Sequence, residues 1–394
     1  MSLKQHASLA DLAYSSPTLG NDGKYDTMQA DGIKYKVLGH SDKASGYQGT
    51  IFQNPNTGEI IVAHRGTEFV RQPGPDGAVD AAMIGRVNLQ AKDAIALTEM
   101  AVRLAKEQNV DISVTGHSLG GALAQITAHR FNLPGDAFNP YGTASLNLRI
   151  PEGSPRGAAT FTNHVMAGDF VSAASPHYGK VEMYVLPKEL EVLRQSAPFH
   201  NNPLAKTVPA LALVAHAGDL GRMVDSHRMH HFLDVDVKGD PDRSVLDDPN
   251  ARLTSPEDRK LVADYRERVA DSRVSATVVS RGVPGVIADF HDKLRGPLPP
   301  GAGLTPEQEP PHRGHAGGGT SFTPTSTAIS PQLESVLNKQ NTNDQRDFVR
   351  VNDQAARQPA GIEFTDLACT PLDPSQAPTA AAPQQDAEKA APAR

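Results

Sequence analysis

The chain has 394 residues, of which 38% are hydrophobic and 21% are charged, and its formal net charge is −7. This length allows one large domain or two smaller ones. The mildly acidic balance argues against a nucleic-acid-binding protein, because such domains are usually strongly basic. The single cysteine, Cys369, cannot form an internal disulfide, so the fold does not depend on one.

The start of the chain predicts no targeting segment. Residues 1–6 have neither the basic start nor the apolar run of a signal peptide, and no stretch approaches the roughly 18 apolar residues of a transmembrane helix. We therefore expect a chain made in the cytoplasm, with export only by a route that needs no N-terminal signal.

Between residues 59 and 186, short apolar runs alternate with helical patterns. Runs that are rich in β-branched residues, or that alternate with polar ones, predict strands at 59–63, 110–114, 163–167 and 181–186. Apolar residues at helical spacing predict helices at 88–108 and 122–130. Strands that alternate with helices favour an α/β fold with a mostly parallel sheet flanked by helices, in which ligands bind beyond the carboxyl ends of the strands.

The composition changes along the C-terminal part of the chain. We expect one main α/β domain at 1–238 and a charged, helical extension at 239–295, where Leu261, Val262, Tyr265 and Val269 recur near helical spacing. Residues 296–394 are rich in Pro, Gly, Ala and Gln, so they predict a mostly disordered tail with a docking or secretion-signal role.

The segment Gly116-His117-Ser118-Leu119-Gly120-Gly121 follows a predicted strand and precedes a predicted helix. It matches the nucleophile-elbow pattern, in which a serine sits on a tight turn that only small neighbours allow to close. The turn lifts the hydroxyl above the edge of the sheet and directs N–H groups of the next helix at a developing oxyanion. We therefore take Ser118 as the candidate nucleophile.

A second segment, His64-Arg65-Gly66-Thr67-Glu68, follows the strand predicted at 59–63. In α/β-hydrolases one oxyanion donor is the N–H of the residue after the nucleophile, and another comes from a loop after an earlier strand. These positions correspond to Leu119 and Thr67. His64 and Arg65 could equally be solvated or structural residues.

These two segments, in this order, resemble the class 3 lipases, the fungal-lipase-like family of α/β-hydrolases, over roughly residues 7–235. The resemblance implies a serine activated by a histidine that an aspartate orients, in the chain order Ser, Asp, His. Asp169, in Asp169-Phe170-Val171, fits the aspartate, whereas Asp136 lies too soon after the helix that follows the nucleophile.

The histidine is expected in residues 225–232, which hold three candidates. His227, followed by Phe232, fits the family pattern best, and His230 and His231 remain alternatives. Three close histidines could also bind a metal, but no partner cysteine or acidic cluster has zinc-like spacing. We therefore expect neither a metal nor an organic cofactor.

The resemblance also gives roles to other segments. Residues 71–87 occupy the position of the lipase lid, and the apolar stretch 204–220 is either a second cap for lipid contact or a core helix. The expected activity is hydrolysis of lipid carboxylic esters, of the triacylglycerol lipase or phospholipase A1 type, at a membrane surface. The alternatives are a non-lipid esterase, a peptidase, or a non-catalytic binding or scaffold protein on a hydrolase fold.

The layout of the chain resembles that of bacterial lipase effectors, which dedicated secretion systems deliver to competitors. It combines a lipase-like body with a C-terminal extension rich in Gln, Ala and Pro. This resemblance implies an antibacterial, secreted toxin. It also implies a protein partner through the C-terminal region, either an immunity protein encoded by a neighbouring gene or a component of the secretion machinery. No nucleic-acid partner is expected.

Overall fold

The structure is a computed structural model that describes residues 2–66, 76–144, 146, 148–200, 223–271 and 294–302, with the backbone alone described for 76–86 and 197–200. Several features predicted from the sequence lie outside these residues: Thr67, the first part of the expected lid, the 204–220 stretch and the tail beyond residue 302. Within them, no helix is long and apolar enough to cross a membrane.

Among the described residues, eight strands form one sheet, in which neighbours in space are also neighbours in sequence. They are β1 (Met28–Ala30), β2 (Ile33–Asp42), β3 (Gln48–Gln53), β4 (Ile60–His64), β5 (Ile112–His117), β6 (Gly135–Phe138), β7 (Phe161–Met166) and β8 (Lys180–Tyr184). Strands β1 to β4 pair antiparallel, and β4 to β8 pair parallel. The expected α/β fold with a mostly parallel sheet is therefore confirmed.

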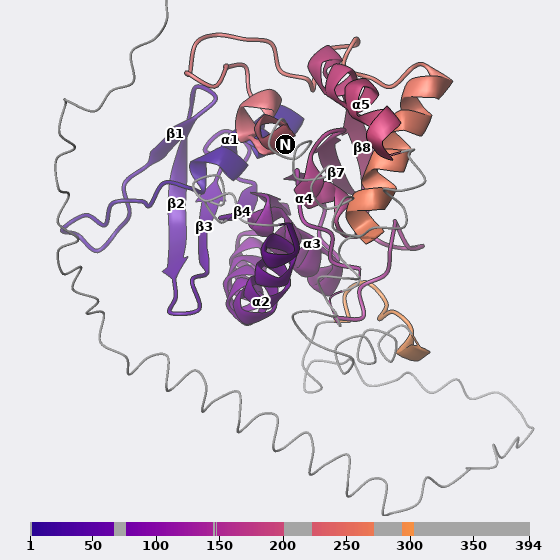
Figure 1. Cartoon of the computed structure of the whole chain (residues 1–394). Helices are drawn as coiled ribbons and strands as arrows, with labels where there is room; N and C mark the ends of the chain where they lie inside the picture. The colour runs from indigo at the N-terminus through magenta and orange to yellow at the C-terminus, as the bar shows by residue number, and fades with distance from the viewer. Residues whose placement is uncertain are drawn as a thin grey trace, which may run out of the picture. The chain divides into compact units, whose positions relative to one another are not determined.

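Helices precede, connect and follow the parallel strands, and they cover both faces of the sheet. They are α1 (Leu3–Leu12), α2 (Asp76–Gln108), α3 (Leu119–Phe131), α4 (Phe170–Ala173) and α5 (Pro187–His200). Helix α2 joins β4 to β5 and α3 joins β5 to β6, and the two helices lie side by side in Figure 1. Because the parallel strands share one direction, β5 and β7 end at the same edge of the sheet.

The core of the sheet follows the two-residue alternation of a strand. In β4, Ile60 and Val62 pack into the cluster that contains α2 and α3, whereas Ile61 and Ala63 pack into a cluster with α1. All four side chains are buried. A strand buried on both faces reads as a continuous apolar run, which is why the sequence predicted it.

Two differences from the sequence predictions concern element boundaries. Helix α2 begins at Asp76 rather than at residue 88, so the second half of the expected lid segment is helical. Its first turns contain Gly77 and Gly85, which lower helix propensity and hide the helix in the sequence. The antiparallel strands β1 to β3 were not predicted. Strand β1 has only three residues, β2 is only partly buried, and β3 holds just two large apolar residues, Ile51 and Phe52, among glycine and polar residues.

The predicted helical stripe in the C-terminal extension lies on a helix that packs against the hydrolase core. Residues 256–271 are helical, and Val262, Tyr265 and Val269 are buried in the same cluster as α2 and α3. Residues Met1–His312 form one compact unit. The domain boundary expected at residue 238 stays a prediction.

Candidate active site

Ser118 occupies the tight turn between β5 and α3. Its backbone has φ 58° and ψ −124°, a conformation that side-chain-bearing residues rarely adopt. The turn closes because its neighbours lack side chains. A Cβ on Gly116 would lie 2.4 Å from the Gly120 carbonyl oxygen, and a Cβ on Gly120 would lie 2.1 Å from the His64 carbonyl oxygen. The strand–turn–helix setting expected for the nucleophile elbow is therefore present.

The turn also fixes the backbone groups around Ser118. The Ser118 N–H donates to the Phe138 carbonyl at 3.1 Å, and the Ala122 N–H donates to the Ser118 carbonyl at 3.1 Å. Leu119 is the first residue of α3. N–H groups in the first turn of a helix lack acceptors within the helix, and the helix dipole makes this end favourable for negative charge. Leu119 thus lies where an oxyanion donor is expected.

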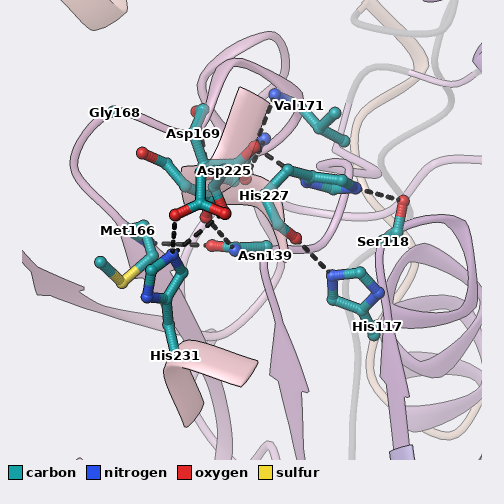
Figure 2. A network of polar contacts seen from close by, with 12 residues as sticks. His117, Ser118, Asn139, Met166, Gly168, Asp169, Val171, Asp225, His227 and His231 are labelled. Carbon is teal, nitrogen blue, oxygen red and sulfur yellow. Dashed lines mark hydrogen bonds and ion pairs between the residues drawn. The ribbon is translucent and has the colours of Figure 1, made fainter. Parts of the chain in front are cut away.

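His227 and Asp169 meet Ser118 at the carboxyl end of the sheet, as Figure 2 shows. His227 Nε2 lies 2.9 Å from Ser118 Oγ, and His227 Nδ1 lies 2.9 Å from Asp169 Oδ1. All three side chains are buried. A carboxylate can only accept a hydrogen bond, so Nδ1 carries the ring proton and Nε2 is left to accept the serine proton.

Asp169 caps the short helix α4 just after β7. Its two carboxylate oxygens accept hydrogen bonds from the Val171 and Ser172 N–H groups at 3.1 and 3.0 Å. Burial pushes the pKa of Asp169 up, but the attraction of His227 and the hydrogen bonds from His227 and Ser172 outweigh it and hold the pKa below its ordinary value. The carboxylate therefore stays ionised beside the imidazole.

Three side chains hold the turn that carries Asp169. Glu189 accepts from the Gly168 N–H at 2.9 Å, Tyr265 donates to the Gly168 carbonyl at 3.0 Å, and Arg266 donates to the Ser172 carbonyl at 2.8 Å. Burial raises the pKa of Glu189 and lowers that of Arg266. Tyr265 and Arg266 come from the helix at 256–271, so the C-terminal extension contributes to the candidate site.

His117 and Asn139 hold the segment that carries His227, and Tyr14 in turn holds His117. His117 Nε2 donates to the His227 carbonyl at 2.7 Å, and Tyr14 O–H donates to His117 Nδ1 at 2.8 Å. Burial, with a smaller effect of nearby His227, lowers the pKa of His117 to about 3, so this ring is neutral at pH 7. Asn139 donates to the Ser226 carbonyl at 2.7 Å. The backbone on either side of Cα of His227 is therefore bonded to β5 and to the end of β6.

The other residues considered from the sequence lie elsewhere. His230 and His231 lie next to Asp225, and Asp136 is held by His6 and His164. His64 is buried between Tyr47 and Thr127, and burial lowers its pKa to about 3.

These positions separate the predicted residues into three groups. The structure brings Ser118, Asp169 and His227 together, with Leu119 beside them, and it makes His64 a structural residue. Thr67 lies outside the described residues.

Known proteins and families resemble part of this chain. Residues 5–186 match the model of the Phospholipase-like family, described as the Tle-like phospholipase domain. Among solved structures, the chain is similar to Lip2 lipase from Yarrowia lipolytica, with 16% identity, a TM-score of 0.33 and coverage of 47% of this chain and 78% of that chain. A lipase from Rhizopus microsporus var. chinensis gives 18%, 0.34, 46% and 75% for the same quantities. No curated protein matches the chain.

The sheet and the serine elbow define the class as an α/β-hydrolase. The family match narrows the class, because it places residues 5–186 in a lipase-like family of ester hydrolases. The chain thus carries a phospholipase-like domain and is a lipid ester hydrolase.

Proposed function

We propose that Ser118, His227 and Asp169 are the catalytic triad of this lipid ester hydrolase, with the Leu119 and Thr67 N–H groups as oxyanion donors. The observation that carries the proposal is the continuous chain of contacts from Ser118 Oγ through both nitrogens of His227 to Asp169, with both distances 2.9 Å. The positive φ of Ser118 adds support, because strained backbone at a strand-to-helix turn is typical of a nucleophile elbow.

The geometry supports a two-step reaction. Ser118 Oγ attacks the ester carbonyl carbon while His227 Nε2 takes the hydroxyl proton. The bond from the carbonyl carbon to the alcohol oxygen then breaks, and the alcohol leaves with the proton from Nε2, so that the acyl group stays on Ser118. Water then attacks the acyl carbon and gives a proton to Nε2. The bond from the acyl carbon to Ser118 Oγ breaks, Oγ takes that proton from Nε2, and the fatty acid leaves. Asp169 stabilises the imidazolium formed in each step.

The proposed substrate class is the carboxylic esters of lipids, with glycerophospholipids and acylglycerols as its two members. The domain match supports this class rather than a choice between the two. Cleavage of a phospholipid would release one fatty acid and a lysophospholipid, whereas cleavage of a triacylglycerol would release a diacylglycerol.

Mass spectrometry of lipids treated with the full-length chain tests the proposal. We expect free fatty acid from phosphatidylethanolamine and phosphatidylglycerol vesicles or from trioleoylglycerol emulsions, and none with Ser118→Ala protein that is equally folded by circular dichroism. Vesicles labelled with different acyl chains at the two glycerol positions assign the position cleaved. Equal product from wild-type and Ser118→Ala protein would refute the proposed nucleophile.

The biological role that we propose is that of an antibacterial effector acting on the membrane lipids of another cell. The Tle-like family match and the layout of the chain support it. Production of the wild-type chain in the periplasm of a bacterial host should arrest growth, Ser118→Ala should not, and co-production of the neighbouring gene product should restore growth. Unimpaired growth with catalytically active protein in the periplasm would argue against this role.

A further inference from the structure

A second group of titratable side chains lies on the same segment as His227. Asp225, His230 and His231 are half-buried and offer three ligand atoms that lie within 4.8 Å of one another. Asp225 Oδ2 is 3.6 Å from His231 Nε2 and 3.9 Å from His230 Nε2, and the two imidazole ring centres are 4.0 Å apart. Within the described part of the chain, this is the one group of three or more such residues close enough to share an ion.

The spacing of these atoms fits a small cation better than it fits direct pairing. Two ligands at about 2.0–2.1 Å from a tetrahedral Zn²⁺ are about 3.4 Å apart. The Asp225–histidine distances exceed this value by only a few tenths of an ångström, and both are too long for hydrogen bonds. Two imidazoles and one carboxylate are ligands that Zn²⁺ takes in proteins, and three protein ligands leave a fourth position for water.

A second histidine–aspartate group shows what direct pairing looks like in this fold. Asp136 receives His6 Nδ1 at 2.5 Å and His164 Nε2 at 3.0 Å, so each of its carboxylate oxygens has an imidazole at hydrogen-bond distance. Asp225 differs, because its Oδ2 faces two imidazole nitrogens at longer distances and its side chain is 45% exposed. An ion from solvent can therefore reach Asp225.

His227 is not a member of this group, although it lies between its members in sequence. Figure 2 shows His231 directed at Asp225, whereas His227 is directed at Ser118. Both ring nitrogens of His227 are engaged, one with Asp169 and the other with Ser118. An ion at Asp225 would therefore take no ligand from the proposed triad.

We propose that Asp225, His230 and His231 form a binding site for a divalent transition-metal ion of the Zn²⁺ type. The ion would replace the His231 Nε2 proton, which now lies between that nitrogen and the Asp225 carbonyl oxygen 3.0 Å away. It would join the 3₁₀ turn η2 (Val224–His227) to the 3₁₀ turn η3 (Met229–Phe232). The site would thus fix the two ends of the segment that carries His227.

Metal binding by the full-length chain, freed of ions with a chelator, tests the site without any measurement of hydrolysis. Isothermal titration with ZnCl₂ should show one specific ion per chain, and titration with MgCl₂ should show none, because Mg²⁺ prefers oxygen ligands. Co²⁺ in the same site should give visible absorption bands that Zn²⁺ abolishes. The thermal midpoint should rise with added Zn²⁺, because an ion that binds only the folded chain stabilises it.

Single substitutions assign the ligands. Asp225→Asn and His230→Ala should each weaken Zn²⁺ binding at least about 10-fold. Loss of a residue that only hydrogen-bonds to a metal ligand already costs about that much, and these two residues are proposed as the ligands themselves. Asp234→Asn is the matched control. It removes the same charge nine residues away, from a carboxylate that Lys4 pairs at 2.7 Å, and it should leave Zn²⁺ binding unchanged.

Two outcomes would overturn the site: no Zn²⁺ binding by wild-type protein, or unchanged binding in both Asp225→Asn and His230→Ala. The variants must keep the thermal midpoint of metal-free wild type, and a variant that does not is replaced by Asp225→Ser or His230→Gln. Repeating the titration in Ser118→Ala protein separates this proposal from the proposed function, since metal binding should survive there even if the triad assignment fails.

Discussion

The part of the chain that the structure describes contains two Ser–His–Asp chains of contacts, at opposite ends of strand β5. At the carboxyl end of β5, His227 joins Ser118 to Asp169. Near its amino end, His6 Nε2 lies 2.9 Å from Ser113 Oγ, and His6 Nδ1 lies 2.5 Å from Asp136 Oδ2. The same ring nitrogens face the same partner types in both, yet we assign catalysis only to the first.

The difference lies in the serine hydroxyl and in its backbone. Ser113 Oγ donates to Glu59 Oε1 at 2.9 Å, so its proton is directed away from His6. Ser113 also sits within β5, whereas Ser118 has φ 58° at the first turn of a helix. A nucleophile needs an accepting base and nearby donors for the oxyanion, and only the carboxyl end of the strand offers both. Side-chain distances alone therefore do not define an active site.

The largest expected effect is the loss of activity when Ser118, but not Ser113, is replaced by alanine. Ser118→Ala should lower kcat/KM for a p-nitrophenyl ester by at least about 10⁴-fold, because the nucleophile is lost. Ser113→Ala, the matched control, should retain wild-type activity with reduced stability. Similar losses of activity in the two variants would erase the distinction between the two serines.

The two aspartates should separate catalysis from stability. Asp169→Asn should lower kcat about 10⁴-fold with a folded protein, because the amide no longer fixes the Nδ1–H tautomer of His227. Asp136→Asn should leave kcat unchanged but lower the free energy of unfolding by about 3 kcal/mol, because it leaves two buried histidines without their carboxylate. Ester kinetics and urea denaturation measure the two effects, and a reversed pattern would contradict the comparison.

Acid should reduce the stabilisation that Asp136 gains from His6 and His164. Burial opposes ionisation of Asp136, but the hydrogen bonds and charges of His164 and His6 outweigh it, so its folded pKa lies below the ordinary 3.8. Such a carboxylate stabilises the fold above its unfolded pKa, and this contribution is lost as the pH falls from about 4 toward the folded pKa. The difference in unfolding free energy between wild type and Asp136→Asn should therefore shrink below pH 4. A difference that grows there would show that the pKa is raised.

The smallest expected effect concerns the turn that carries Asp169. Tyr265→Phe removes the hydrogen bond to the Gly168 carbonyl and should cost about 1 kcal/mol of stability, with a several-fold lower kcat. Tyr35→Phe is the control, because the buried Tyr35 hydroxyl has no hydrogen-bond partner within the described residues. Denaturant midpoints and ester kinetics are measured for both variants. Equal stability and equal kcat in the two would show that the Tyr265 hydroxyl does not support the candidate site.

The sequence predicted the parts of the site that local patterns encode. The elbow at Ser118 is a contiguous segment between a strand and a helix, so the motif together with these flanking patterns indicates it. Asp169 and His227 required the order of residues in a family, because nothing local distinguishes His227 from His230 or His231. Their separation appears only in three dimensions, where one ring faces Ser118 and the others face Asp225.

The supporting residues were missed for a related reason. Asn139 reaches the Ser226 carbonyl, and Arg266 reaches the Ser172 carbonyl, across 87 and 94 residues of sequence. A single polar residue carries no periodic signal, and its partner is a backbone group that every residue has. The apolar stripe around Tyr265 was visible, but the surface that it covers was not. Such contacts follow from the packing of whole elements.

The conformation of Ser118 has a consequence for how this protein can change. A non-glycine residue in such a backbone region costs roughly 1–3 kcal/mol, against a typical domain stability of about 5–15 kcal/mol. The close packing that the surrounding glycines allow and the backbone hydrogen bonds of the turn must offset this strain in the folded state. We therefore expect variants selected for heat resistance to accumulate changes away from this turn, since relaxing the turn would gain durability only by giving up turnover.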